Sequence, residues 1–210
     1  DAMSSSASKG ESVADTVKVV SCYADIIAMR HPLEGSAKGA SKYSSVPIIN
    51  AGDGGHLHPT QTLTDIVTLH NEKGRLNHLT IGLCGDLKNG RTVHSLIKTM
   101  SHFEGNKFVL ISTKELGIPK YIKDIMQEQN CEYVEVPTLQ EAMPQLDVLY
   151  MTRIQRERFA SMEEYEAQKG VFVLDREKLS LGKEDLKVLH PLPRVDEIAE
   201  NIDDDPRCVY

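Results

Sequence analysis

The feature that most constrains the fold is a series of short, almost continuously apolar segments separated by amphipathic ones. A strand covered by helices on both faces has no polar side, so its sequence is apolar throughout rather than alternating. The alternation therefore predicts an α/β fold with a doubly wound parallel sheet. The predicted strands are LTIGLCGD (79–86), KFVLIS (107–112), CEYVEV (131–136), DVLYMTR (147–153) and LKVLHPL (186–192), with VFVL (171–174) short and extended. The predicted helices are 91–103, 119–130, 139–146 and 161–170.

The N-terminal third carries a weaker version of the same pattern. Valines at helical spacing predict a helix over 11–24, and strands follow at 25–30 and 46–52 with a helix over 34–43 between them. A long helix is predicted over 59–74, where Gly74 ends it. We therefore expect two parallel-sheet α/β subdomains, the first of them incomplete. The expected boundaries are a partial first domain at 1–58, an interdomain helix at 59–74 and a second domain at 75–210.

Composition and charge exclude several classes of protein. The net charge of -7 argues against nucleic acid or an anionic membrane as the main partner. No apolar run approaches the ~20 residues of a membrane-spanning helix, and the first residues do not resemble a signal peptide. The four cysteines lie far apart with no Cys-x-x-Cys pair, so we expect no metal site and a reducing, cytoplasmic compartment. We expect no cofactor.

Arginines follow several of the predicted strands. In an open parallel sheet, ligands bind beyond the carboxyl ends of the strands. Those ends carry Arg30, Arg91, Arg153 and Arg194 in a chain that is acidic overall. An arginine can hold a carboxylate or phosphate through two parallel hydrogen bonds, although each one alone could equally form a structural ion pair. Four at one predicted edge indicate a small polyanionic ligand.

The segment AGDGGHLHPTQTLTDI (51–66) joins a glycine-rich loop to a helix. Proline is tolerated at the first helical position, so Pro59 predicts His58 as the N-cap and places Thr60 and Gln61 in the first turn. The helix dipole there favours a negative oxygen, and a His and a Gln amide would suit a polarised carbonyl. The alternative is that His58 only caps the helix. We interpret His56 as an ordinary loop residue.

Two further segments carry weaker signals. GDLKNGRTVHS (85–95) is a glycine-rich turn, but it has neither the Lys-Ser/Thr of a P-loop nor the spacing of a dinucleotide fingerprint. Within it, Arg91 at the helix start can point into a cleft, whereas His94 one turn later is interpreted as helix packing. MSSSASKGES (3–12) is either a flexible terminus with a capping Ser or a phosphate-binding loop.

Taken together, these motifs carry a family resemblance. MRHP, NAGDG, HPTQTLTD, GDLKNGRTVHS, LYMTRIQRERF and HPLPRVDEI stand in the order and spacing of aspartate carbamoyltransferase catalytic chains, over residues 5–210. The sister ornithine carbamoyltransferases share the His-Pro-x-Gln motif. Their pattern, however, has HCLP where this chain has HPLP, and it includes a Ser-Met-Gly segment. This chain has HPLP and no such segment, so it resembles the aspartate enzymes more closely.

The resemblance implies transfer of a carbamoyl group from carbamoyl phosphate to the amine of L-aspartate, a step of pyrimidine biosynthesis. On the matching positions, Arg30 and His58 would contact the carbonyl oxygen, with Arg30 also reaching the phosphate. Gln61 and the backbone carbonyls of Pro191 and Leu192 would hold the carbamoyl amino group.

The remaining matched positions imply the aspartate site and an assembly. Arg91 would bind the α-carboxylate of aspartate, and Arg153 and Gln155 would serve its side-chain carboxylate. Ser5 and Lys9 match a loop that, in the family, reaches the active site of the neighbouring subunit of a homotrimer. Regulatory chains are a further candidate partner.

One departure from the family pattern affects the expected activity. The Ser-Thr-Arg-Thr segment that cradles phosphate in the family lies upstream of Ser5 and occurs nowhere in the chain. We therefore expect these 210 residues alone to be incomplete for activity. Two alternatives stay open: a non-catalytic carbamoyltransferase-like domain of a larger pathway protein, and a carbamoyltransferase for another amine. Whether Arg153 and Gln155 meet a second carboxylate distinguishes the last from the aspartate enzyme.

Overall fold

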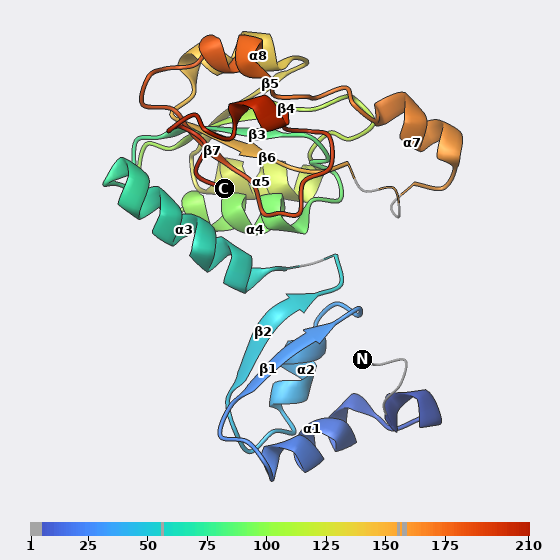
Figure 1. Cartoon of the computed structure of the whole chain (residues 1–210). Helices are drawn as coiled ribbons and strands as arrows, with labels where there is room; N and C mark the ends of the chain where they lie inside the picture. The colour runs from blue at the N-terminus through green and yellow to red at the C-terminus, as the bar shows by residue number, and fades with distance from the viewer. Residues whose placement is uncertain (1–5, 56, 155, 157–158) are drawn as a thin grey trace. The chain divides into compact units, whose positions relative to one another are not determined.

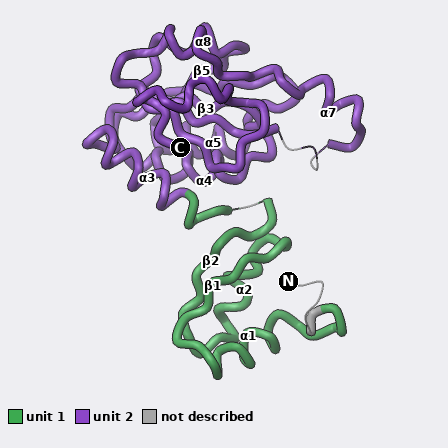
Figure 2. Tube along the Cα trace, viewed as in Figure 1, with its two compact units in different colours: residues 1–61 green, residues 62–210 purple. Residues whose placement is uncertain are grey.

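The computed structural model of the chain describes residues 6–55, 57–154, 156 and 159–210. It divides into two compact units, one up to Gln61 and one from Thr62 to Tyr210 (Figure 2). The division falls inside helix α3 (Pro59–Lys73), which Figure 1 labels, and the first turn of this helix belongs to the first unit (Figure 2).

The first unit is a small parallel α/β unit. Its elements are η1 (Ser6–Lys9), α1 (Val13–Ser21), β1 (Ile27–His31), α2 (Ser36–Ser41) and β2 (Ile48–Asp53). Strands β1 and β2 pair in parallel, with Ile27 opposite Ile48. The side chain of Ser12 accepts the backbone N–H of Asp15 at 3.1 Å and so starts α1, as expected for a serine N-cap. The predicted parallel pairing in this part of the chain is confirmed.

The second unit is built on a five-stranded parallel sheet. Its strands are β3 (Thr80–Cys84), β4 (Lys107–Ile111), β5 (Glu132–Val136), β6 (Val148–Met151) and β7 (Lys187–Leu189), in the order β5-β4-β3-β6-β7. The connecting helices and turns are α4 (Arg91–Met100), α5 (Lys120–Glu128), α6 (Leu139–Ala142), η2 (Met143–Gln145), α7 (Met162–Gln168), α8 (Arg176–Ser180) and η4 (Glu200–Ile202).

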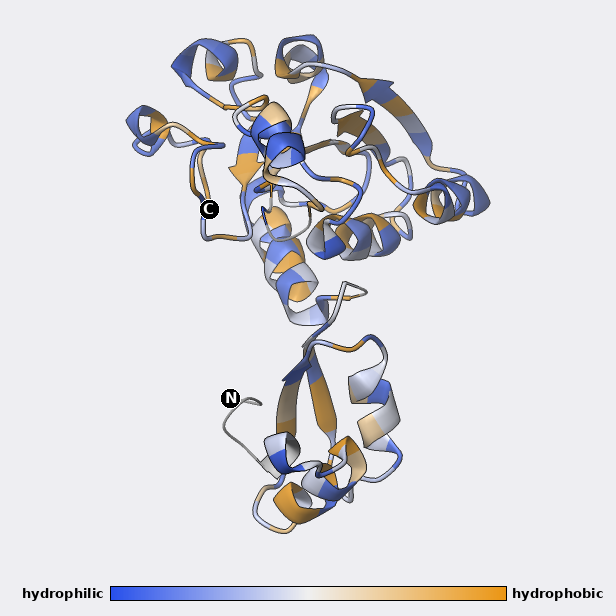
Figure 3. Cartoon of the chain, turned by 90° about the vertical axis from the view of Figure 1, so that its right-hand side faces the viewer, coloured by the Kyte–Doolittle hydropathy of each residue, from blue (hydrophilic) through white to orange (hydrophobic). Residues whose placement is uncertain are grey.

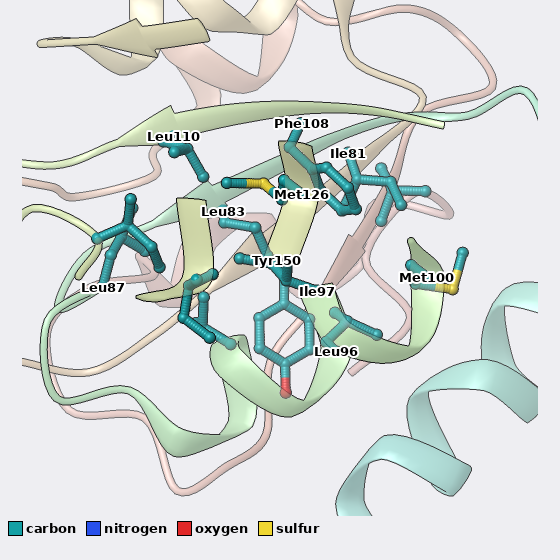
Figure 4. Close-up of a cluster of buried hydrophobic side chains, with 14 of the residues drawn as sticks. Ile81, Leu83, Leu87, Leu96, Ile97, Met100, Phe108, Leu110, Met126 and Tyr150 are labelled. Carbon is teal, nitrogen blue, oxygen red and sulfur yellow. The ribbon is translucent and has the colours of Figure 1, made fainter. Parts of the chain in front are cut away.

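Side chains that alternate along the strands form two separate cores, one on each face of the sheet. On one face Leu83, Leu110 and Tyr150 pack with apolar residues of α4 and α5 (Figure 4). On the other face Val109 and Leu149 pack with residues of α6, η2 and α8. Both faces of these strands are therefore buried, which is why their sequences are almost continuously apolar. The predicted doubly wound fold is confirmed.

Several predicted elements differ in detail. The predicted helix 139–146 is α6 followed by the 3-10 turn η2, because Pro144 has no N–H to continue an α-helix. The extended segment 171–174 adds only an isolated bridge between Leu174 and Ile198, not a strand of the sheet. The sequence did not predict α8 or η4, which are one to two turns long.

Candidate active site

The carboxyl ends of β3 and β6 lie side by side where the strand order reverses. From β3 the chain proceeds to β4 and β5 on one side, and it returns to place β6 against the other side of β3. In open α/β sheets this switch point opens a crevice at the strand ends, where ligands bind. Arg91 begins the helix that follows β3, and Arg153 lies two residues beyond the end of β6. Two of the predicted arginines therefore flank the switch point.

A close backbone approach fixes the two strand ends to each other. Gly85 has a φ of +115°, and a Cβ there would lie 2.5 Å from the carbonyl oxygen of Thr152. Thr152 donates its backbone N–H to the Cys84 carbonyl at 2.9 Å and its hydroxyl to the same oxygen at 2.8 Å. Only glycine fits this place, and the contact anchors the residue immediately before Arg153.

The turn between β3 and α4 is held by its own polar side chains. The buried Asp86 carboxylate accepts the backbone N–H of Asn89 at 3.0 Å and its side-chain amide. His94 is buried, donates Nε2–H to the Leu87 carbonyl at 2.7 Å and accepts the Tyr121 hydroxyl on Nδ1 at 2.8 Å. Burial lowers the pKa of His94, so the neutral ring suits both bonds. The interpretation of His94 as packing is confirmed; it braces the turn before Arg91.

The turn after β7 contains the predicted Pro191 and Leu192. Pro191 is half-buried and Leu192 is exposed, with a φ of +45°. Nearby Arg194 forms an ion pair with Asp203 and lies 5.7 Å from the centroid of the Tyr210 ring. The guanidinium holds the pKa of Asp203 down to about 2. For Arg194 the alternative interpretation, a structural ion pair, is therefore the one that the structure supports.

The first unit carries Arg30 and the glycine-rich loop. Arg30 is the exposed fourth residue of β1. The loop after β2 folds back because Gly54 has a φ of +54° and donates its N–H to the His31 carbonyl at 2.9 Å. The carboxylate of Asp53, which is buried, accepts the Gly35 N–H at 2.8 Å. These contacts place the loop at the carboxyl end of the short sheet.

His58 lies directly before the first turn of α3. Its Nδ1 accepts the backbone N–H of Gln61 at 3.4 Å and lies 3.4 Å from the Thr60 hydroxyl. The helix begins at Pro59, as predicted. An imidazole that accepts on Nδ1 carries its proton on Nε2, so the cap and a hydrogen bond donated to a ligand oxygen do not compete for one nitrogen.

The predicted site residues are divided between the two units. The second unit brings Arg91, Arg153 and the Pro191–Leu192 turn to the carboxyl edge of one sheet. Lys9 is the exposed last residue of η1. Ser5, His56 and Gln155 lie outside the described residues.

The sequence did not reveal a buried polar contact between α3 and β6. Tyr150 lies among the apolar side chains of the core shown in Figure 4. Its hydroxyl donates to the buried Asp65 carboxylate at 3.0 Å and is also hydrogen-bonded by Thr92. Asp65 is buried on α3 together with Thr62 and Leu69. Hydrophobic and hydrophilic residues alternate along this helix (Figure 3). An Asp in a helix and a Tyr in an apolar strand each fit ordinary surface and core positions, so neither one alone indicated the pair.

The described residues contain neither a metal-binding cluster nor a membrane-spanning helix. Within the described ranges, no group of three or more His, Cys, Asp or Glu side chains is arranged to hold a metal ion. None of the helices in those ranges has both the length and the apolar character needed to cross a membrane.

Comparison with known proteins identifies the family. Residues 1–71 match the family model of the aspartate/ornithine carbamoyltransferase carbamoyl-P binding domain, and residues 77–210 match the Asp/Orn binding domain. The chain is 61% identical over 210 residues to the aspartate carbamoyltransferase catalytic subunit of Clostridium novyi, covering all of this chain and 69% of that one. The chain belongs to the aspartate carbamoyltransferase family. The resemblance read from the motifs is confirmed, and the chain is a transferase by family.

Solved carbamoyltransferase structures share the fold. The catalytic subunit of M. jannaschii aspartate transcarbamoylase is 48% identical, with a TM-score of 0.89, over 98% of this chain and 67% of that one. Aspartate transcarbamoylase from Trypanosoma cruzi, in complex with N-(phosphonacetyl)-L-aspartic acid, is 38% identical with a TM-score of 0.92, over 100% of this chain and 68% of that one.

Proposed function

We propose that the chain acts in the transfer of the carbamoyl group from carbamoyl phosphate to the amine of L-aspartate, giving N-carbamoyl-L-aspartate and phosphate. The observation that carries the proposal is the pair Arg91 and Arg153 at the switch point of an acidic protein. Two guanidinium groups there suit a ligand with two carboxylates. Related T. cruzi structures contain carbamoyl phosphate and aspartate, and the family assignment agrees.

The first unit would act on the carbamoyl group. Arg30 and His58 would donate to its carbonyl oxygen, with Arg30 also reaching the phosphate, and Gln61 would hold the amino group. His58 supports this role because its Nδ1 accepts the Gln61 N–H at the helix N-terminus, so in the neutral ring the proton lies on Nε2. The exposure of Arg30 on β1 agrees with a ligand contact.

The second unit would bind aspartate and the amino end of the carbamoyl group. Arg91 would take the α-carboxylate, and Arg153 with Gln155 the side-chain carboxylate. The backbone carbonyls of Pro191 and Leu192 would accept the carbamoyl N–H groups. This distribution makes the second carboxylate the feature that distinguishes aspartate from other amines.

The chemistry needs orientation and charge stabilisation rather than a covalent nucleophile. The neutral amine of aspartate attacks the carbonyl carbon, forming a C–N bond and a tetrahedral oxyanion. The C–O bond to phosphate then breaks, phosphate leaves with the electron pair, and the nitrogen passes its extra proton to the departing phosphate. Donors fixed near the developing oxyanion lower this barrier, and two anions held in register supply the orientation.

The assembly and compartment belong to the same proposal. We propose a homotrimer in which Ser5 and Lys9 contribute to a neighbouring subunit's site, with regulatory chains as a further candidate partner. The widely separated cysteines, with no Cys-x-x-Cys pair, support a cytoplasmic protein. We also propose functional boundaries at 1–58 for carbamoyl phosphate, 59–74 for the interdomain helix and 75–210 for aspartate.

Substitution of His58 tests the proposal. Removing one oxyanion donor typically lowers turnover by about 10²–10³-fold, so we expect that loss for His58→Ala in a colorimetric assay of carbamoyl aspartate. His70→Ala is the matched control, because His70 lies on the same helix and is exposed. Near-wild-type turnover in folded His58→Ala would refute the role. Because these 210 residues alone are expected to be incomplete for activity, both variants are assayed in protein that also carries the family's upstream phosphate-binding segment. No product from that wild-type protein with either aspartate or ornithine would favour the non-catalytic alternative, and product with ornithine alone would favour another amine.

A further inference from the structure

The turn after β7 is organised around one buried imidazole. His190 follows β7 directly, and its side chain is 1% exposed. Its Nδ1 accepts the backbone N–H of Leu192 at 2.8 Å, so in the neutral ring the proton lies on Nε2. Nε2–H donates to Oε1 of Glu197 at 2.7 Å. The ring therefore links the backbone of Leu192 to a carboxylate five residues further along the chain.

The Glu197 carboxylate holds the other side of the same turn. Its Oε2 accepts the backbone N–H groups of Val195 at 3.2 Å and Asp196 at 3.1 Å. Burial alone would raise the pKa of Glu197, but the bonds from His190 and the backbone together keep it below its ordinary value. One ionised carboxylate and one neutral imidazole thus accept hydrogen bonds from three backbone N–H groups of a single turn.

Both ends of this network are anchored in the core. Leu189, before His190, belongs to the buried face of the sheet. The Glu197 carbonyl accepts the Leu174 N–H at 2.9 Å, and Ile198 beside it is buried. The ends of the turn are therefore fixed, and the side-chain network sets the path between them.

The network uses the backbone N–H groups of the turn and leaves two of its carbonyl groups able to accept a hydrogen bond from a ligand. Within the described ranges, the carbonyl groups of Pro191 and Leu192 accept no hydrogen bond. Leu192 also has a φ of +45°, a conformation that is unfavourable for a branched residue and persists only when its surroundings enforce it. The Nδ1 acceptor of His190 holds the N–H of Leu192, which lies in one peptide plane with the Pro191 carbonyl, so it fixes the direction of that carbonyl directly. The Leu192 carbonyl lies between this bond and the Val195 and Asp196 N–H groups that Glu197 holds.

We infer that His190 and Glu197 are positioning residues, which aim the backbone carbonyls of Pro191 and Leu192 at the amino group of the carbamoyl ligand. The inference rests on the proposed role of those two carbonyls. It adds that discrimination between carbamoyl phosphate and inorganic phosphate depends on a buried His–Glu pair that does not touch the ligand. Inorganic phosphate has no amino group, so the orientation of the carbonyls does not affect its binding.

The test compares these two ligands by calorimetric titration of the full chain in its native assembly. Glu197→Gln breaks the network in either orientation of the amide. Its NH2 donor must face either the Nε2–H of His190 or the backbone N–H groups of Val195 and Asp196, and two donors cannot form a hydrogen bond. His190→Asn keeps an acceptor near the Nδ1 position but loses the donor to Glu197, and His190→Gln does the reverse. Glu184→Gln is the matched control: it removes the same charge at an exposed position.

We expect each network variant to lose roughly five- to tenfold in affinity for carbamoyl phosphate, about the worth of one neutral hydrogen bond, with phosphate affinity unchanged. Unchanged preference in folded variants would overturn the inference and leave the proposed function standing. A parallel loss for both ligands would also overturn it, since that is what a merely structural role produces. If the wild-type protein did not prefer carbamoyl phosphate, the proposed role of the carbonyls would fail and the inference with it. If Glu197→Gln does not fold, the two His190 variants decide.

Discussion

Tyr150→Phe is expected to destabilise the second unit by an amount set by one buried hydrogen bond. The Tyr150 side chain is fully buried, and its hydroxyl donates to the Asp65 carboxylate at 3.0 Å. Phenylalanine fills the same space without the hydroxyl, so the cost is the lost bond and the desolvated carboxylate left behind. For a bond to a charged acceptor we expect a loss of about 1.5–3 kcal/mol in the free energy of unfolding.

Urea unfolding followed by far-UV circular dichroism measures this loss. With an m-value of about 2 kcal/mol/M, the midpoint should fall by roughly 0.8–1.5 M at unchanged slope. Tyr133→Phe is the matched control, because Tyr133 packs beside the same core and its hydroxyl bonds to no described residue. A midpoint shift for Tyr150→Phe no larger than that of the control would refute the reasoning.

The same bond has a pH signature. Burial, and then the charge of Asp65, raise the pKa of Tyr150 well above its ordinary value. In the unfolded chain the phenol ionises near pH 10. The folded state therefore keeps a proton that the unfolded state releases, so the stabilisation is complete below about pH 10 and is lost as the pH rises above it. Stability between pH 9 and 11 should fall less steeply in Tyr150→Phe than in the wild-type protein.

Two further predictions concern the strand ends and a helix cap. Gly85→Ala should lower the free energy of unfolding by roughly 2–4 kcal/mol, because it adds backbone strain at a φ of +115° to a clash with the Thr152 carbonyl. Gly74→Ala is the control: its surroundings are open, so the same urea assay should show a loss of about 1 kcal/mol. Equal losses for the two variants would rule out the clash. Asp175→Ala should cost about 1 kcal/mol, since the Asp175 carboxylate accepts the Lys178 N–H at 2.9 Å as the N-cap of α8, whereas Asp175→Ser should cost little. The side chain and then the backbone of Lys178 lower the pKa of Asp175 from 3.8, so its stabilising effect should be present above about pH 4 and be lost in more acidic solution, as thermal melts across pH 3–6 would show. An equal melting-temperature loss for Asp175→Ser would contradict the capping role.

The local sequence was enough to predict the start of α3 and the class of fold. Pro59 after His58 specifies a helix start, because proline fits the first helical position and little else in a helix. Buried strands such as β3 (Thr80–Cys84) were recognisable because a strand covered on both faces has no polar side. Among the described residues, the elements that were missed or altered include η1, α6 with η2, α8 and η4, which are too short for periodicity to detect.

Whether each arginine forms a structural ion pair could not be predicted from its position along the chain. Arg91, Arg153 and Arg194 all follow strands of one sheet, yet Arg194 pairs with Asp203, nine residues further on. An ion pair depends on where a turn brings two side chains in space, and the sequence shows only their separation along the chain. The Tyr150–Asp65 bond spans 85 positions for the same reason.

By itself, the sequence determined the fold class, the family and the residue types available for chemistry, because helical and strand periodicity and motif order are properties of the chain alone. Only the tertiary structure decided which of those residues meet. The parallel pairing of β3 with β6 brings Arg91 and Arg153 to one edge, and the Gly85–Thr152 contact fixes the distance between their strands. The His190–Glu197 pair follows from a turn whose two ends are held by different parts of the core, an arrangement that only packing can specify.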